Sequence, residues 1–413
     1  MSRTGRRKDT PEVLGLLDVG TTKIVCLIVQ SGTLGWQIIG IGHQRSRGLK
    51  AGVVVDLDQA EEAVRATVAQ AEAMARIELS DICLAVSCGR LASRIFTARA
   101  DTSDGLVSDD DVARVLTAGR AFAERDGRCL VHLNRLGWRL DGTAGVAEPV
   151  GMAADRIEAD LHAVTADDAP LRNLLHVAER CYLEAGTLAV TAHASAVAVT
   201  SEDERRLGVT VVDLGGGATT IAEMRDDQLV GVHSLPIGGN HVTFDLARTL
   251  AATVGEAERV KTLHGTLLPS LTDAHELVSY RFAEAEAMEL GEVDRSEIRE
   301  IVTPRIDTML ALIAERLATQ TEWSRSSGPV VLTGGASQLT GLIEHAGEAL
   351  RRPIRLGRPL ALGGLPDGLC TPAFATAVGL LPLALAARTD RSWRGARQNG
   401  VLGHVGRWMR ESF

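Results

Sequence analysis

Three short glycine-bearing segments, each directly after an apolar run, most constrain the fold of this chain. Their sequences are DVGTTK (18–23), DLGGGATT (213–220) and GGAS (334–337). A short apolar run that ends in a glycine turn is typical of a buried strand in an α/β protein. Three such turns, in this order and with this spacing, predict loops that converge on one nucleotide between two α/β lobes.

These loops suit a phosphate chain, because only Gly and small residues let backbone N–H groups approach an anion closely. We expect the first two loops to grip the phosphates from opposite sides, Lys23 to add a positive charge, and the third loop to approach the adenosine. Glu258 and Lys261 are expected at the ribose; the alternative is a solvated i,i+3 pair. The expected nucleotide contacts are Gly20, Thr21, Thr22, Lys23, Gly215, Gly216, Gly217, Thr219, Gly238, Glu258, Lys261, Gly334, Gly335 and Ala336.

Two carboxylates, Asp18 and Asp213, lie where strand-like runs end beside these loops. Mg²⁺ prefers one or two carboxylates together with water and phosphate oxygens. We therefore expect Asp18 and Asp213 to hold Mg²⁺ through water, next to bound ATP. For either residue alone, a turn cap is the alternative interpretation.

The net charge and the cysteines exclude several classes of protein. The formal net charge is −9 over 413 residues, which argues against nucleic acid as the main partner, because nucleic-acid binders usually carry a basic footprint. The six cysteines are scattered without a paired CxxC spacing, as expected for reduced thiols in a cytoplasmic protein. No secretory signal and no apolar stretch of ~20 residues is visible, so we expect membrane contact only from outside the bilayer.

The α/β alternation is interrupted by an insert with its own pattern. A helix expected over 57–77 and a strand over 82–86 precede it, a strand expected over 129–133 lies within it, and a helix expected over 194–200 follows it. Within the insert, Ser108 is expected to cap a helix that continues to about Glu124. After the second glycine loop we expect largely helical structure over 241–320. The pattern predicts a small α+β domain inside a larger α/β protein.

At this level of detail the chain resembles the FtsA family of actin-like cell-division proteins. The segments that carry the resemblance are VHLNRLGWRLDG (131–142), EPVGM (148–152), RIEADLHAVTA (156–166), LPIGGNHVTFDLA (235–247), AERVKTLHG (257–265), SW (392–393) and GRWMRESF (406–413). The first three are similar to the small domain of this family, often called 1C, and the last is similar to its terminal membrane helix. The resemblance covers residues 12–413.

The resemblance implies a two-lobed actin-like (ribonuclease H-like) α/β fold with a small α+β (SHS2, 1C) domain inserted in the first lobe and a C-terminal amphipathic helix. The implied units are the first lobe (13–82, 166–194 and 359–386), the insert (83–165), the second lobe (195–229 and 304–358), a helical subdomain (230–303), and a linker with a membrane-targeting helix (387–413).

The function that the resemblance implies is that of an ATP-binding protein that polymerises and tethers the tubulin-like protein FtsZ to the inner membrane. Its location would be the cytoplasmic face of that membrane at the division septum. The implied partners are FtsZ, further copies of the chain, other division proteins through the 1C domain, and an anionic membrane surface. The FtsZ tail would dock on the helical subdomain, where Arg305 is an expected contact.

The second glycine loop departs from the family pattern. The family usually has Gly-Gly-Gly-Thr-Thr-Asp, whereas here the glycines are followed by ATT (218–220), without the acid. Relatives that hydrolyse ATP have an acidic or amide residue where the helix after the interdomain strand begins. This chain offers His193 to orient the attacking water; a structural role at the helix start is the alternative. We therefore expect ATP binding with at most slow hydrolysis.

The C-terminal segment has the pattern of an interfacial membrane helix. On a helical projection its apolar residues fall within an arc of about 140°, with Arg407 and Arg410 opposite. The apolar residues are Val401, Leu402, Val405, Trp408, Met409 and Phe413. The alternative is a helix that packs on its own core or on a partner.

Three other functions are alternatives to this one. A small-molecule kinase of the same superfamily needs a dedicated carboxylate base, which the sequence does not offer, and has no use for the amphipathic tail. An Hsp70-like chaperone needs a peptide-binding domain, whereas only 27 residues follow Ala386. A pilus-assembly relative of FtsA would share the core and a similar insert, and the terminal anchor distinguishes the division protein from it.

Overall fold

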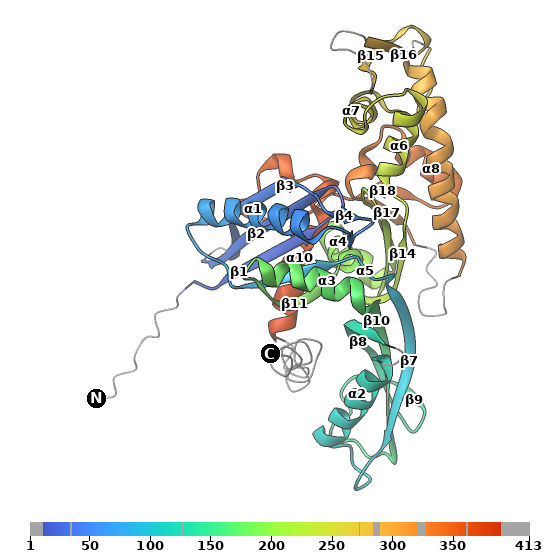
Figure 1. Ribbon diagram of the computed structural model, residues 1–413. Coiled ribbons are helices and arrows are strands. Elements are labelled where there is room, and N and C mark those ends of the chain that lie inside the picture. Colours follow the sequence, from blue (N-terminus) through green and yellow to red (C-terminus); the bar gives the residue numbers. More distant parts are fainter. Residues whose placement is uncertain are drawn as a thin grey trace.

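The computed structural model describes residues 11–33, 35–124, 127–271, 273–283, 290–319, 328–360 and 362–389. Two five-stranded sheets form its centre and a four-stranded sheet forms the insert. Figure 1 shows the insert projecting from one end of the molecule, while the hairpin of β15 (Leu277–Arg281) and β16 (Leu290–Asp294) lies at the other end. The two sheets agree with the expected pair of lobes.

The first central sheet has the strand order β11-β6-β1-β2-β3. Its strands are β1 (Val13–Val19), β2 (Lys23–Gly32), β3 (Gly35–Arg45), β6 (Asp81–Val86) and β11 (Glu184–Val190). Because successive side chains of a strand point to opposite faces, Leu17 packs in the cluster that includes α1 (Leu57–Ala75), and Leu16 packs in the cluster that includes α10 (Ala375–Thr389). The sheet is therefore buried on both faces.

The second central sheet repeats the local arrangement of the first. Its order is β14-β13-β12-β17-β18. Its strands are β12 (Val209–Leu214), β13 (Thr219–Arg225), β14 (Gln228–Leu235), β17 (Val330–Thr333) and β18 (Ile354–Leu356). β12 pairs antiparallel with β13 and parallel with β17, as β1 does with β2 and β6. The first glycine loop connects β1 to its antiparallel neighbour β2, and the second glycine loop connects β12 to its antiparallel neighbour β13 in the same way.

The insert is a four-stranded sheet with one helix. The sheet order is β7-β10-β8-β9. Its elements are β7 (Ala92–Asp101), α2 (Asp109–Ala123), β8 (Arg128–Leu140), β9 (Thr143–Val146) and β10 (Arg156–Asp167). Ser108 caps α2 in a capping box with Asp111, as predicted. The strand expected over 129–133 is longer than predicted, because β8 pairs with β10 along nearly its whole length.

The helical part of the second lobe contains α6 (Gly239–Thr249), α7 (Val254–His264) and α8 (Arg295–Ala318). The expectation of largely helical structure over 241–320 is wrong at the hairpin β15–β16. In β15 the buried residues alternate with exposed ones, Val278 and Tyr280 being inside. This period of two is the pattern of a half-buried strand. The segment therefore forms a strand, although the elements around it are helices.

The remaining elements are short or connect the lobes. They are β4 (Leu49–Lys50), β5 (Val53–Val54), α3 (Asp168–Arg180), α4 (Thr191–Val199), α5 (Glu202–Leu207), α9 (Leu342–Leu350) and the 3₁₀ helices Asp273–His275, Gly335–Gln338, Asp367–Leu369 and Pro372–Phe374. Among the described residues, none of the helices is both long and apolar enough to span a membrane. The expected amphipathic segment, 401–413, lies outside the described residues.

Candidate nucleotide-binding cleft

The three glycine loops converge on one cavity of about 580 Å³ between the two central sheets. Most of the expected contacts line it. They are Asp18, Gly20, Thr21, Thr22, Lys23, Asp213, Gly215, Gly216, Gly217, Glu258, Lys261, Gly334, Gly335 and Ala336. Segments separated by more than a hundred residues in the sequence therefore share one site. Thr219 and Gly238 are not among the residues that line it.

The first two loops have the same turn and touch each other. Gly20 N–H donates to the carbonyl of Lys23 at 3.0 Å, and Gly215 N–H donates to that of Ala218 at 3.0 Å. A Cβ on Gly216 would lie 2.2 Å from Cγ2 of Thr22, a distance that real side chains do not reach. The loops of the two lobes thus leave no room for a larger residue at Gly216.

Two further glycines hold the second and third loops in place. Gly334 has φ +85°, and a Cβ there would lie 2.2 Å from Oδ1 of Asp213. A Cβ on Gly238 would lie 2.5 Å from the carbonyl oxygen of Gly215. Thr219 is buried, and its hydroxyl donates to the carbonyl of Ile237 at 2.8 Å. Gly238 and Thr219 therefore stabilise the second loop without lining the cavity themselves.

The cavity contains two buried carboxylates and one buried ammonium group. Burial raises the pKa of Asp18 to about 6; nearby Lys23 opposes this rise, and Asp213 adds to it. Burial lowers the pKa of Lys23 to about 8. Burial also raises the pKa of Asp213, although hydrogen bonds from Ser195 and Thr376 oppose it. Two buried carboxylates at one cavity, whose burial disfavours the charged form of each, suit a divalent cation.

Lys23 also contacts the 3₁₀ helix Pro372–Phe374, which directly precedes α10. Its Nζ donates to the carbonyl of Ala373 and lies 3.6 Å from the ring centroid of Phe374. A cation over an aromatic face is attracted by the ring quadrupole. These two contacts hold the ammonium group at the cavity.

Glu258 and Lys261 form an ion pair of 2.6 Å, and both also line the cavity. Lys261 Nζ donates to the hydroxyl of Thr243 at 2.8 Å and to the carbonyl of Gly239 at 3.2 Å. These hydrogen bonds hold the pair, which lies on α7, against α6 at the cleft. The ion pair between Glu258 and Lys261 agrees with the interpretation as an i,i+3 pair. Their position in the lining of the cavity agrees with the interpretation as nucleotide contacts.

His193 does not lie with the loops. It lines a different cavity, where its ring centroid is 5.1 Å from that of His132. Burial lowers its pKa well below the usual value. The helix was expected to begin at Ala194, whereas α4 begins at Thr191, so the residue that faces the cleft from the first turn is a different one.

Thr191 is that residue, and the sequence reasoning missed it. It opens α4, lines the nucleotide cavity and is 8% exposed. Its hydroxyl has no hydrogen-bond partner in the part of the chain that the structure describes. A buried donor without a partner is costly, so this hydroxyl is suited to a ligand or water in the cleft. The sequence feature that could have identified Thr191 is its position directly after the strand that ends at residue 190.

Ser195 and Thr376 were also missed. Both hydroxyls donate to Oδ2 of Asp213, that of Thr376 at 3.1 Å, and they lie 2.8 Å from each other. Because Oδ2 is occupied in this way, Oδ1 remains on the side of Gly334. α4 and α10 thereby orient the carboxylate. The only sequence signal was a hydroxyl residue inside each of two apolar helices.

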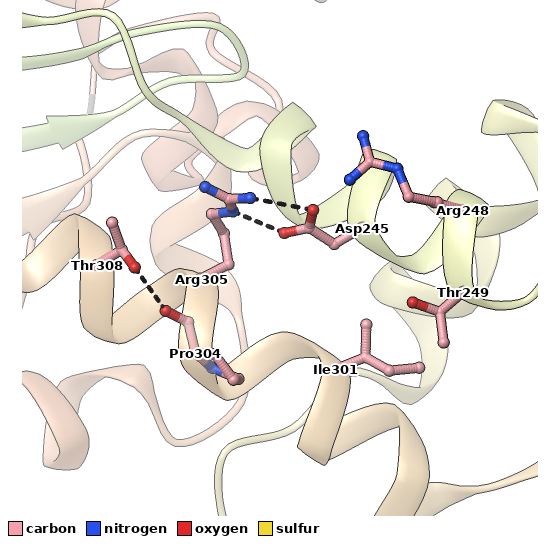
Figure 2. A pocket seen from close by; sticks show the side chains of 7 residues that line it. All are labelled: Asp245, Arg248, Thr249, Ile301, Pro304, Arg305 and Thr308. Carbon is pink, nitrogen blue, oxygen red and sulfur yellow. Dashed lines mark hydrogen bonds and ion pairs between the residues drawn. The ribbon is translucent and has the colours of Figure 1, made fainter.

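Arg305 does not line the cleft but a separate pocket of about 320 Å³ (Figure 2). Its guanidinium donates to both carboxylate oxygens of Asp245, at 2.6 and 3.1 Å. In Figure 2, Arg248 points toward the same carboxylate from α6, and Ile301 and Pro304 form the apolar wall on α8. The pocket therefore combines positive charge with an apolar surface.

Comparison with known proteins assigns this architecture to a family. Residues 210–379 match the family described as Cell division protein FtsA, and residues 89–165 match the SHS2 domain inserted in FTSA. The Cell division protein FtsA of Rhizobium meliloti (strain 1021) is 37% identical over 419 residues, which cover 97% of this chain and 95% of that relative. The chain belongs to the FtsA family of cell-division proteins.

Solved structures share the FtsA-type fold at low sequence identity. The PilM-PilN type IV pilus biogenesis complex aligns with a TM-score of 0.65 and 18% identity, covering 90% of this chain and 98% of that one. MreB 5 of Spiroplasma citri bound to AMPPNP aligns with a TM-score of 0.56 and 13% identity, covering 93% and 98%. These likenesses confirm the actin-like fold, and the FtsA matches take precedence over the pilus-assembly and kinase alternatives.

Proposed function

We propose that this chain is an ATP-binding scaffold that ties FtsZ to the cytoplasmic face of the inner membrane at the division septum. The observation that carries this proposal is the convergence of three distant glycine loops on one cavity, together with Asp18, Asp213 and Lys23. Membership of the FtsA family and the AMPPNP described for its fold neighbour MreB 5 support it.

In this proposal the phosphates lie between the loops 20–23 and 215–217, and Lys23 exchanges its contacts with Ala373 and Phe374 for a phosphate oxygen. Asp18 and Asp213 would hold Mg²⁺ through water. The donor set fits, because Mg²⁺ keeps several waters and needs only one or two protein carboxylates. Gly334, Gly335 and Ala336 would face the adenosine.

We infer that hydrolysis is slow or absent. The second loop lacks the acid of the family pattern, and the first turn of α4 presents Thr191 to the cleft. A hydroxyl orients water but does not accept a proton at neutral pH, whereas a general base must. His193 does not supply this base, because it lies in the other cavity. The chain would act mainly by binding nucleotide and partners.

We expect the contribution of Mg²⁺ to ATP affinity to fall as the pH decreases from 7 to 5. The folded pKa of Asp18, about 6, lies above its ordinary value, so the carboxyl group is mostly ionised at pH 7 and mostly protonated at pH 5. Protons then compete with Mg²⁺, which weakens Mg²⁺-dependent binding by roughly tenfold. Calorimetry with ATP, with Mg²⁺ or EDTA, measures this effect. Asp18→Asn is the control, because it removes the titrating group; an equal decrease in that variant would contradict the prediction.

The membrane anchor in this proposal is the segment 401–413, which lies outside the described residues. Trp408 and Met409 on one side and Arg407 and Arg410 on the other suit the interface of an anionic bilayer. A single short helix binds weakly, but polymerisation of the chain makes many anchors act together. The insert 89–165 remains the proposed contact for other division proteins.

We propose the pocket of Arg305 as the docking site for the FtsZ tail. Arg248 and Arg305 offer positive charge, and Ile301 and Pro304 offer an apolar wall (Figure 2). Such a pocket fits a peptide that carries both a carboxylate and apolar side chains. In the free protein the carboxylate of Asp245 takes the place of that of the peptide.

Arg305→Ala is expected to weaken binding of a peptide from the FtsZ C-terminus by roughly 10- to 100-fold, because a hydrogen bond to a charged group is lost. Fluorescence anisotropy with a labelled peptide measures this loss. Arg316→Ala, on the exposed end of the same helix, is the matched control and should bind as the unchanged chain does. Asp245→Asn, which removes the competing carboxylate, should bind at least as tightly. Equal affinities of Arg305→Ala and Arg316→Ala would contradict the assignment.

A further inference from the structure

A second cavity, of about 760 Å³, lies between the insert, the first lobe and one turn of the second lobe, away from the glycine loops. We call it the insert cavity. Its walls come from β8 and α2 of the insert, from β11, from His193 of α4, from the last turn of α10, and from the turn between β13 and β14. Among the residues that line it are Leu116, Leu133, Trp138, Val150, Leu188 and Leu383. The nucleotide function described above does not use this surface.

The insert cavity contains a buried hydrogen-bond donor that lacks an acceptor. Trp138 is 3% exposed, and among the described residues its indole Nε1 has no partner. The guanidinium of Arg135 lies 4.9 Å from the ring centroid, over its face. An unsatisfied buried donor costs free energy that a ligand carrying an acceptor recovers. The orphaned donor lies in the wall itself, and the apolar lining residues suit an occupant with apolar side chains.

The described part of the chain ends close to this cavity. Leu383, Ala386 and Ala387 of α10 line it, and the described residues end at Thr389. In Figure 1 the end of α10 emerges beside β11, on the side of β8 and α2. Residues 390–400 are eleven in number and span up to roughly 35 Å when extended. The segment 401–413 is therefore within reach of every wall of the cavity.

We propose that the insert cavity binds the chain's own segment 401–413 when no membrane is present. This inference rests on the proposed anchoring function of that segment. The apolar residues of the segment, Trp408 and Met409 among them, would face the apolar wall of the cavity. The occupant is a segment of the same chain, so no further partner is required.

The rim of the cavity offers two carboxylates to the arginines of the segment. They are those of Asp109 and Glu148. Asp227 at the rim is paired with Arg205, and Arg120 is paired with Glu124. The segment carries Arg407 and Arg410 against Glu411. The imidazoles in the cavity do not oppose this pairing, because burial lowers the pKa of His132 to about 4 and that of His193 well below its usual value. Both are neutral at physiological pH.

Docking of this kind would regulate membrane binding. The same apolar face of the segment cannot lie in the cavity and in lipid at once. Apparent membrane affinity is then reduced by the fraction of chains with a free segment. If nine-tenths of the chains are docked, binding to vesicles is about tenfold weaker than that of a chain whose cavity is blocked.

A pair of matched substitutions in the full chain tests the proposal. Val150→Arg places a positive charge and a long side chain at the rim of the cavity, where Val150 is 38% exposed. Val254→Arg adds the same charge at the start of α7, where Val254 is 47% exposed and remote from the cavity. Because both valines are on the surface, neither change should unfold the chain.

The first measurement is amide hydrogen exchange of residues 401–413 without lipid. We expect slow exchange in the unchanged chain and in Val254→Arg, and about tenfold faster exchange in Val150→Arg. Fast exchange in all three chains overturns the proposal. Protection that increases with protein concentration also overturns it, because the segment then binds to a second copy.

The second measurement is binding to vesicles that contain phosphatidylglycerol. We expect Val150→Arg to bind about tenfold more tightly than Val254→Arg. Equal binding of these two variants overturns the proposal. A third outcome separates docking from anchoring. If the segment is protected from exchange in the unchanged chain and in Val254→Arg, but none of the chains binds vesicles, docking is supported and the proposed anchor is overturned. The two failures are therefore distinguishable.

Discussion

Gly216→Asp is expected to abolish ATP binding, with an affinity loss of at least ~100-fold. A Cβ at this position would lie 2.2 Å from Thr22 Cγ2, so the two loops must separate. The new carboxylate would also face the phosphates, and juxtaposed like charges cost several kcal/mol. Isothermal titration calorimetry with ATP and Mg²⁺ measures the loss.

The matched control for this prediction is Gly255→Asp. Gly255 lies in the first turn of α7, and a Cβ there would meet no atom within 4 Å. It adds the same carboxylate at a place where a helix N-terminus tolerates negative charge. ATP affinity should be unchanged. Unchanged affinity of Gly216→Asp as well would count against the cleft as the nucleotide site.

A chain that ends at Arg388 is expected to lose its binding to anionic vesicles. The deletion removes every residue of the apolar arc, including Trp408 and Met409, together with Arg407 and Arg410. Each Arg near an anionic surface contributes about 1 kcal/mol, and the apolar face contributes the rest. Arg388 itself is kept, so its ion pair with Glu12 remains.

Liposome co-sedimentation of the intact and the shortened chain, each with and without ATP, measures this effect. The intact chain should pellet with the vesicles, more strongly under conditions in which it polymerises, since many anchors then act together. A full-length chain with Trp408→Glu controls for length and should also stay in solution. Equal pelleting of the intact and shortened chains would remove the anchor from the account.

The candidate cleft is connected to the insert cavity through one helix. At its start, α10 contributes Thr376 to the carboxylate of Asp213, and the residues just before it receive Lys23. At its end, α10 lines the insert cavity. The two cavities thus share a single element of the first lobe, which precedes the segment that we propose as the anchor.

The sequence predicted the loops of the cleft because their chemistry is local. A tight turn after a buried strand needs Gly at fixed positions, so Gly20, Gly216 and Gly334 were visible without the fold. The same holds for Asp18 and Asp213, which directly precede these turns in the sequence. Thr376 was not predictable in this way, because its role depends on a helix more than 150 residues away from Asp213.

Two errors have the same physical origin, a misplaced boundary between elements. Moving the start of α4 from Ala194 to Thr191 exchanges His193 for Thr191 at the cleft. In the helical part, alternation of buried and exposed residues over 277–281 was too short to stand out between long helices. Propensity and periodicity place an element well but place its ends poorly.

The most direct test of the central claim is a crystal structure of the chain with Mg²⁺ and AMPPNP. We predict the phosphates between the loops 20–23 and 215–217, the metal with its water shell between Asp18 and Asp213, and the adenosine at Gly334–Gly335. A nucleotide bound elsewhere, or a nucleotide that contacts only one of the two lobes, would contradict the account.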